Sequence, residues 1–305
     1  MEKVKQMKQP VSPELRKRVL ALRRNHTFGE VAKSTKLPLG TVKTICSRSG
    51  AFRDNLKLRK LFALPPIKKS KKSLPSVPVM PKKKNVTGDL EIDAMLWLQE
   101  VVETGQADLI SQAIEAAKQI KTPVKELQDR YLKHLVSTNP NNSFSFIFST
   151  INFGNLESLG NSAVGKHLLQ KEATARFGDN LFDDTPAEVW CEEVLKDVVC
   201  GENQIFLPDD VCRKLFSEQT EYLPHTLSDC LHELRYWNEL IRLRDSHDCG
   251  DNSPQTNARD SFVFWSLSQI RPLNKSEAIA VFHYMSEHDA MDRTETNDIL
   301  LNLIG

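Results

Sequence analysis

The chain has 305 residues, of which 40% are hydrophobic and 27% are charged. This composition is typical of a folded protein and, at this length, of two domains joined by a linker, and it excludes a wholly disordered chain. The longest apolar runs contain polar residues and fall short of the ~20 apolar residues of a membrane span, and the first residues lack a secretory signal. We therefore expect a soluble, cytoplasmic protein with no membrane partner.

The net charge of +1 conceals two halves of opposite charge. Residues 1–85 contain 23 Lys and Arg and four acids, a net charge of +19, whereas residues 86–305 contain 18 bases and 36 acids, a net charge of −18. A segment as basic as the first attracts polyanions by releasing their counterions, and the second repels them. The two halves should therefore bind different partners.

Three short helices are predicted in the basic half. Residues 13–24 place apolar side chains at helical spacing among five basic residues. Thr27 followed by Glu30 is a capping-box pattern, which predicts a second helix beginning at Phe28 and ending near Thr35, because Pro38 disfavours helix before itself. A third helix is expected to begin near Thr41. Residues 1–62 are accordingly assigned to one basic domain.

A linker is predicted at residues 63–88. Five prolines and seven lysines lie between Leu64 and Lys84, and such a segment has too few apolar side chains to build a core. We expect an extended, flexible, cationic connection with polyproline character.

Residues 89–305 are predicted to form a larger, acidic, mainly helical domain. Apolar spacing indicates three helices within residues 91–136. Residues 143–151 alternate apolar and small polar side chains, which favours one strand or extended segment, with a buried helix as the alternative. Capping and proline patterns predict further helix starts at Thr122, Thr185, Pro208, Asn274 and Thr296. The fold class is therefore mainly α.

Residues 28–47 carry the pattern of a helix-turn-helix. Val31, Leu37, Val42 and Ile45 fall where two helices and their turn must bury apolar side chains, and Ala32 is small at the position where the helices cross. The stretch resembles the helix-turn-helix of sigma-factor region 4 and of related bacterial regulators and recombinases, particularly in Glu30-Val31-Ala32 and Gly40-Thr41-Val42-Lys43. With the preceding helix included, the resemblance covers about 35 residues, from about residue 13 to residue 50. The stretch departs from that pattern at Lys36, where the turn often has glycine. No region-2-like segment precedes it, so a complete sigma factor is not expected.

The resemblance implies a set of DNA-contacting residues. The N-terminal part of the second helix of such a motif enters the major groove, so Thr41, Lys43 and Thr44 are expected at base edges. Leu39 and Ser47 would lie on or beside this helix. Phosphate contacts are expected from Lys33, Lys36, Arg48, Arg53, Arg23 and Arg24.

Other candidate sites are weaker, and no metal or cofactor is expected. The six cysteines contain no C-x-x-C pair, although His225, Cys230 and His232, or His247 and Cys249, could be combined into a zinc site. The acids around Cys249 read as a solvated loop. Residues 154–166 are rich in glycine, but they lack the order of a phosphate-binding loop.

The function predicted from these patterns is sequence-directed binding of duplex DNA by a non-enzymatic regulator of transcription from a bacterium, phage or plasmid. The acidic domain, residues 89–305, would join a homo-oligomer or bind a protein partner, because one helix-turn-helix reads only a few base pairs. An alternative is a replication, partition or packaging adaptor that recruits its partner through this domain. A second alternative is an effector enzyme held at DNA by the basic domain, and a third is a helical hairpin used for protein contact.

Overall fold

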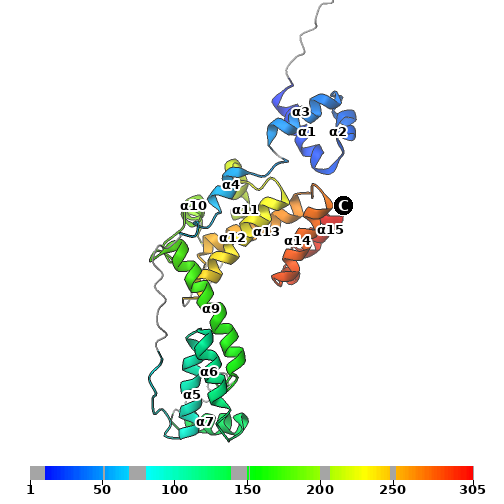
Figure 1. Cartoon of the computed structure of the whole chain (residues 1–305). Coiled ribbons are helices and arrows are strands. Elements are labelled where there is room, and N and C mark those ends of the chain that lie inside the picture. Colours follow the sequence, from blue (N-terminus) through cyan, green and yellow to red (C-terminus); the bar gives the residue numbers. More distant parts are fainter. Residues whose placement is uncertain are drawn as a thin grey trace, which may run out of the picture. The chain divides into compact units, whose positions relative to one another are not determined.

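The computed structural model describes residues 11–50, 52–68, 80–138, 150, 152–199, 207–247 and 252–304 (Figure 1). Within these residues the protein is mainly α-helical and contains no strand, which confirms the predicted class. The segment predicted as a strand, residues 143–151, lies outside them except for Thr150. The α-helices are α1 (Pro13–Asn25), α2 (Phe28–Thr35), α3 (Leu39–Ser49), α4 (Leu56–Leu61), α5 (Leu90–Glu103), α6 (Ala107–Ala117), α7 (Val124–Thr138), α9 (Leu156–Phe177), α10 (Pro186–Leu195), α11 (Asp209–Glu218), α12 (Leu227–Asp245), α13 (Pro254–Gln269), α14 (Lys275–Glu287) and α15 (Thr296–Ile304). The described residues also form two 3₁₀ turns, η2 (Thr220–Tyr222) and η3 (Ala290–Asp292).

The chain divides into two compact units. The first comprises the described parts of Met1–Leu64, Phe182–Ile241 and Gly250–Gly305, and the second comprises those of Pro65–Leu181 and Arg242–Cys249. No helix among the described residues is both long enough and apolar enough to cross a membrane.

Helices α1, α2 and α3 form a three-helix bundle, which we call the head, with a small core of its own. Val19, Val31, Val42 and Cys46 are buried together in it. Each fully buried side chain of this size contributes roughly 1.5–3 kcal/mol to the free energy of unfolding. The core therefore fixes the angles between the three short helices, but it gives the head only a small free energy of unfolding.

The start of α4 is fastened to residues far away in the sequence. The side-chain oxygen of Asn55 caps α4, and its amide nitrogen donates to the backbone carbonyls of Glu221 and Leu223, at 2.9 Å each. The backbone N–H of Asn55 donates to the buried carboxylate of Asp229 at 2.8 Å. Helix α4 is therefore held on η2, on the residue that follows it and on the first turn of α12.

The apolar face of α4 completes the core of the first unit. Leu58 and Phe62 are fully buried, and the Phe62 ring makes edge contacts with Trp190, Tyr236 and Trp237 at centroid separations of 5.7–6.0 Å. The sequence assigned residues 1–62 to one basic domain. The structure instead assigns α4 to the helical core that α10 and α12 contribute to, because its apolar side chains are buried there and not in the head.

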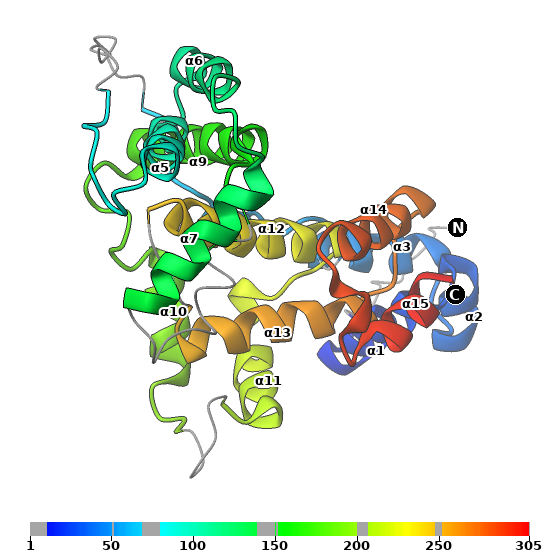
Figure 2. The same cartoon turned by 90° about the horizontal axis from the view of Figure 1, so that it is seen from below.

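A buried ion pair lies at the centre of this core. The guanidinium of Arg259, on α13, donates from Nε and Nη2 to the two carboxylate oxygens of Glu233, at 2.6 and 2.8 Å, and both side chains are fully buried. Four aromatic rings surround the Arg259 guanidinium at 5.0–5.3 Å. Figure 2 shows α13 running between α10, α11 and α15, all of which it contacts. The pair fixes α12 against α13, since removing either charge would leave the other buried without its partner.

In the second unit α5, α6 and α9 pack against one another, and α7 packs on α5. Their core includes Met95, Val102, Leu109 and Leu156. The three helices predicted within residues 91–136 are confirmed as α5, α6 and α7.

The described ends of the predicted linker are packed on this second unit. The backbone N–H of Lys68 donates to the carbonyl of Ala175 at 2.9 Å. The indole N–H of Trp97 donates to the carbonyl of Pro81 at 2.9 Å, and the Lys83 ammonium lies 4.7 Å from the centroid of the same indole. Residues 69–79 of the predicted linker lie outside the described part of the chain. From Pro65 onward the segment belongs to the second unit at both of its described ends, so it does not join the head to a core.

Candidate nucleic-acid interface

The position of α3 in the head is set by local caps. The predicted capping box of α2 is present: the Thr27 hydroxyl accepts from the Glu30 backbone N–H, and Glu30 accepts from the Thr27 backbone N–H at 2.7 Å. These hydrogen bonds hold the pKa of Glu30 below its ordinary value. Helix α2 ends at Thr35 and is followed by Lys36, whose φ of 55° lies in the left-handed region. The carbonyl of Pro38 accepts from two amides of the first turn of α3.

The turn therefore has lysine where glycine would be unstrained. A non-glycine residue in the left-handed conformation costs about 1 kcal/mol, because its Cβ approaches the backbone. The chain accepts this cost at Lys36, and the apolar side chains of the head still meet in one core.

One face of α3 is buried and the opposite face is exposed. Val42 and Cys46 point into the head core. The 3.6-residue period places Gly40, Thr44 and Ser47 on the opposite side, where all three are exposed. We call these three residues the α3 ridge. Its side chains are the hydrogen atom of glycine and two short side chains that each carry a hydroxyl group. The helix backbone can therefore approach a flat or grooved surface closely.

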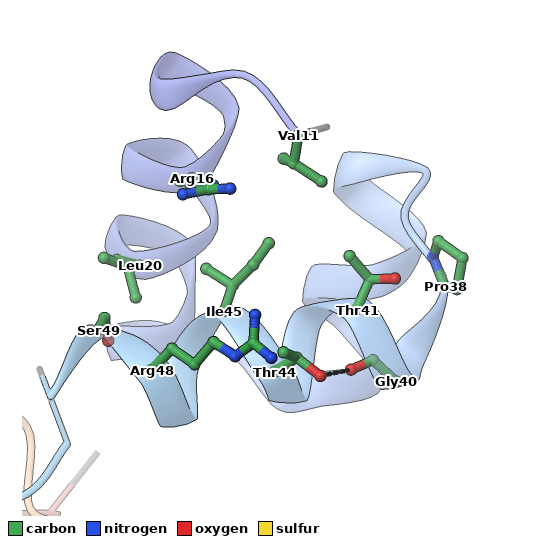
Figure 3. Close-up of a pocket in the computed structure, with 10 residues that line it drawn as sticks. All are labelled: Val11, Arg16, Leu20, Pro38, Gly40, Thr41, Thr44, Ile45, Arg48 and Ser49. Atoms are coloured by element: carbon green, nitrogen blue, oxygen red, sulfur yellow. Dashed lines mark hydrogen bonds between the residues drawn. The ribbon is translucent and has the colours of Figure 1, made fainter. Parts of the chain in front are cut away.

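The hydroxyl groups of the ridge are already engaged in part. Thr44 Oγ1 donates to the backbone carbonyl of Gly40 at 2.8 Å, a bond drawn in Figure 3. Ser47 Oγ accepts from Nη2 of Arg53 at 3.2 Å, which brings Arg53 back beside the end of α3. The two hydroxyl groups therefore have opposite hydrogen-bonding capacities left for a ligand.

Cationic side chains flank the ridge. Lys43 lies along one edge, and Arg48, with the half-buried Thr41, lies along the other. On the Arg48 side α3 and α1 enclose a hollow of about 640 Å³. Arg16 and Arg48 both line this hollow (Figure 3). Its full lining is Val11, Arg16, Leu20, Pro38, Gly40, Thr41, Thr44, Ile45, Arg48 and Ser49.

The head as a whole is strongly basic. Residues 11–53 contain ten Lys and Arg and two acids, Glu14 and Glu30, a net charge of +8. The predicted contact residues Lys33, Lys36, Leu39, Lys43, Thr44, Ser47, Arg48 and Arg53 are all exposed. Charge of one sign at this density gives an anionic polymer a long-range attraction to the head.

Arg23 has an internal role that the sequence did not indicate. Its guanidinium lies 4.2 Å from the centroid of the Phe28 ring and 5.6 Å from that of Phe52, and Nη1 donates to the His26 carbonyl at 3.0 Å. Lys43 Nζ lies 6.0 Å from the same Phe28 ring. Arg23 thus ties the loop between α1 and α2 to the end of the head. The side chain of Arg24 lies outside those that the structure describes.

No protein-family model matches the chain, and no curated protein or solved structure matches it either.

Two residues of the interface were missed at the level of sequence. Neither Gly40 nor Arg16 is among the contact residues that the sequence predicts. The spacing Gly40, Thr44, Ser47 could have shown the ridge, since these residues are four and three apart. The place of Arg16 beside α3 depends on the packing of α1, which no local pattern encodes.

The other candidate sites do not come together among the described residues. Among the described residues no group of three or more metal-ligating side chains gathers. Cys230 is buried in the apolar core, and His232 Nε2 lies 3.2 Å from the carbonyl of Arg59. Most of the glycine-rich stretch 154–166 belongs to α9, where a Cβ added at Gly160 would lie 2.8 Å from a methyl carbon of Ile110. Gly160 therefore serves helix packing. Cys249 and the acids at 248 and 251 lie outside the described residues.

Proposed function

We propose that the head binds duplex DNA in a sequence-directed way, with α3 in the major groove. The observation that carries the proposal is the α3 ridge: three exposed short residues on one helix face with Lys43 and Arg48 on its flanks. The major groove of B-DNA is about 12 Å wide and admits one helix. Short residues let the helix reach the base edges, and long cationic side chains on its flanks reach the phosphates on either side.

The contacts divide accordingly. Thr41, Thr44 and Ser47 are proposed at base edges, with Lys43 at the border between bases and backbone. Arg48 and Arg53 at the end of α3, and Lys33 and Lys36 before it, would bind phosphates and set the register. Arg16 joins this set because it lines the same hollow as Arg48.

The protein is proposed to act as a non-enzymatic regulator of transcription. A single head reads only a few base pairs, so useful affinity requires paired half-sites and a second copy of the chain. The helical remainder, whose net charge is opposite to that of the head, would supply the contacts between copies or to a protein partner. Light scattering on the free protein and on the DNA complex tests the pairing of copies, and a monomer in both states would contradict that pairing.

The DNA-binding proposal is tested with the full chain and fluorescence anisotropy on random duplex DNA across a salt series. Lys43→Ala and Arg48→Ala should each weaken binding to all sequences and reduce the slope of log K against log salt by about one. Lys214→Ala is the matched control, because Lys214 is an exposed lysine of α11, outside the head. Its curve should coincide with that of the wild type. Absence of binding at low salt, or equal losses in all three variants, would refute the proposal.

A further inference from the structure

The hydroxyl of Thr44 has already used its hydrogen. It donates to the carbonyl of Gly40, one turn earlier, at 2.8 Å. A hydroxyl group has one hydrogen, so Thr44 can offer an outside partner only its oxygen lone pairs and its methyl group. Figure 3 shows the oxygen turned toward Gly40 and the methyl carbon turned away from it. The group that Thr44 presents outward is therefore apolar.

The surroundings leave this methyl group accessible. Thr44 is exposed and lies in the middle of the α3 ridge. Gly40 has no side chain, and a Cβ built there would have no atom within 4 Å, so the approach from that end of the ridge is open. Ser47, at the other end, is short as well. A base edge can therefore come to van der Waals distance of Thr44.

The four base pairs differ in what they need from such a residue. Guanine presents two acceptors in the major groove, N7 and O6, and needs donors. Adenine and cytosine present amino groups, and thymine presents its C5 methyl group. Thr44 has no free donor for guanine, and its oxygen is turned back along the helix, away from a base amino group. Its methyl group matches only the methyl group of thymine.

We infer that Thr44 is a specificity-determining residue that reads thymine through methyl–methyl contact in the major groove. This inference rests on the proposed DNA binding. Ser47 provides the internal contrast: its oxygen accepts from Arg53, so its hydrogen is free to donate to a base acceptor. The two hydroxyl residues of the ridge thus select different bases, although they resemble each other in sequence.

The experiment uses the full chain and deoxyuridine, which differs from thymidine only by the missing C5 methyl group. A preferred site is first selected from random duplex DNA, and each thymine in it is then replaced in turn. For the wild type, each half-site should contain one thymine whose single replacement weakens binding about four-fold, which is the contribution of one buried methyl group. Thr44→Ser should lose about the same factor on the unmodified site and become insensitive to that replacement.

Thr44→Val and Ser47→Ala are the matched controls. Valine keeps a methyl group and loses the oxygen, so it should retain the sensitivity to deoxyuridine, and Ser47→Ala should retain it too. Helicity by circular dichroism should be the same in all variants, because both positions are exposed.

The outcomes separate the two proposals. Selection of a site whose deoxyuridine sensitivity is unchanged in Thr44→Ser, or lost in Thr44→Val, overturns the role of Thr44 and leaves DNA binding standing. A selected site in which no thymine methyl group matters does the same. Failure to bind any duplex overturns the proposed function and the inference together.

Discussion

Replacing Phe62 with alanine tests whether α4 belongs to the helical core. The Phe62 ring is fully buried and touches three other aromatic side chains edge-on. Truncating a buried phenylalanine to alanine costs about 3–5 kcal/mol, and favourable aromatic pairs place this site in the upper half of that range. A loss of about 4 kcal/mol is a large share of the stability of a typical domain.

The assay is urea unfolding followed by tryptophan fluorescence, since Trp190 and Trp237 are ring neighbours of Phe62. With a urea m-value of roughly 2–3 kcal/mol/M, Phe62→Ala should lower the midpoint by about 1.3–2 M. The control is Leu56→Ala in the same helix, because Leu56 is 79% exposed. Its effect should stay within about 0.5 kcal/mol. Equally small shifts in both variants would refute the packing argument and restore the boundary at residue 62 that the sequence suggests.

Three further changes test other parts of the structure. Lys36→Gly should stabilise the head by up to about 1 kcal/mol, because glycine adopts the positive φ of this position without strain. Amide hydrogen exchange in α2 and α3 should then slow by up to about five-fold, and an unchanged exchange rate would contradict this. The hydrogen bond from Arg130 holds the pKa of Asp89 below its ordinary value of 3.8, so this carboxylate stabilises the fold above that pH and the contribution is lost as pH falls through the lowered pKa. Asp89→Asn keeps the helix cap, so in this variant the urea midpoint should fall less steeply as the pH is lowered below 3.8 than it does in the wild type. An equally steep fall in both proteins would show that the ion pair does not cause it. Burial raises the pKa of the Cys191 and Cys230 thiols well above the usual range, so Ellman's reagent at pH 8 should leave both unmodified until urea unfolds the protein, and fast labelling of either, located by mass spectrometry, would count against their burial.

The helix starts were the most predictable part of the fold. The capping boxes at Thr27 and Thr185 and the cap at Asn274 are found where the sequence indicates, because each is completed within three residues. Helix α7 begins at Val124, two residues after Thr122, where the sequence predicts a helix start, and the Thr122 hydroxyl donates to Glu91 of α5. Local patterns predict where a helix begins, but they do not show which of its polar groups a neighbouring helix will use.

The parts that could not be predicted depend on contacts between distant residues. Asn55 and Asp229, which are 174 residues apart, hold α4 on the helical core, and nothing near Asn55 in the sequence indicates this. Arg23 was assigned to phosphates because of its charge. Its contact with Phe28 depends on how α1 and α2 cross, which is a property of the packed head. Charge and spacing thus indicated the α3 surface as a whole, whereas the role of each arginine required the fold.

The anchoring of α4 also limits how far the head can move. Only residues 50–54 separate the end of α3 from Asn55, and a fully extended chain of that length spans no more than about 20 Å. If two copies bind paired half-sites as proposed, the separation of their heads is then set by the contact between helical cores and not by the Lys- and Pro-rich segment. Lengthening that segment would leave the permitted half-site spacing unchanged, while a few residues inserted after Gly50 would widen it. The short connection would also keep a second head at a high effective concentration near its half-site once the first is bound. Operator spacing would thus be encoded in the pairing of the cores.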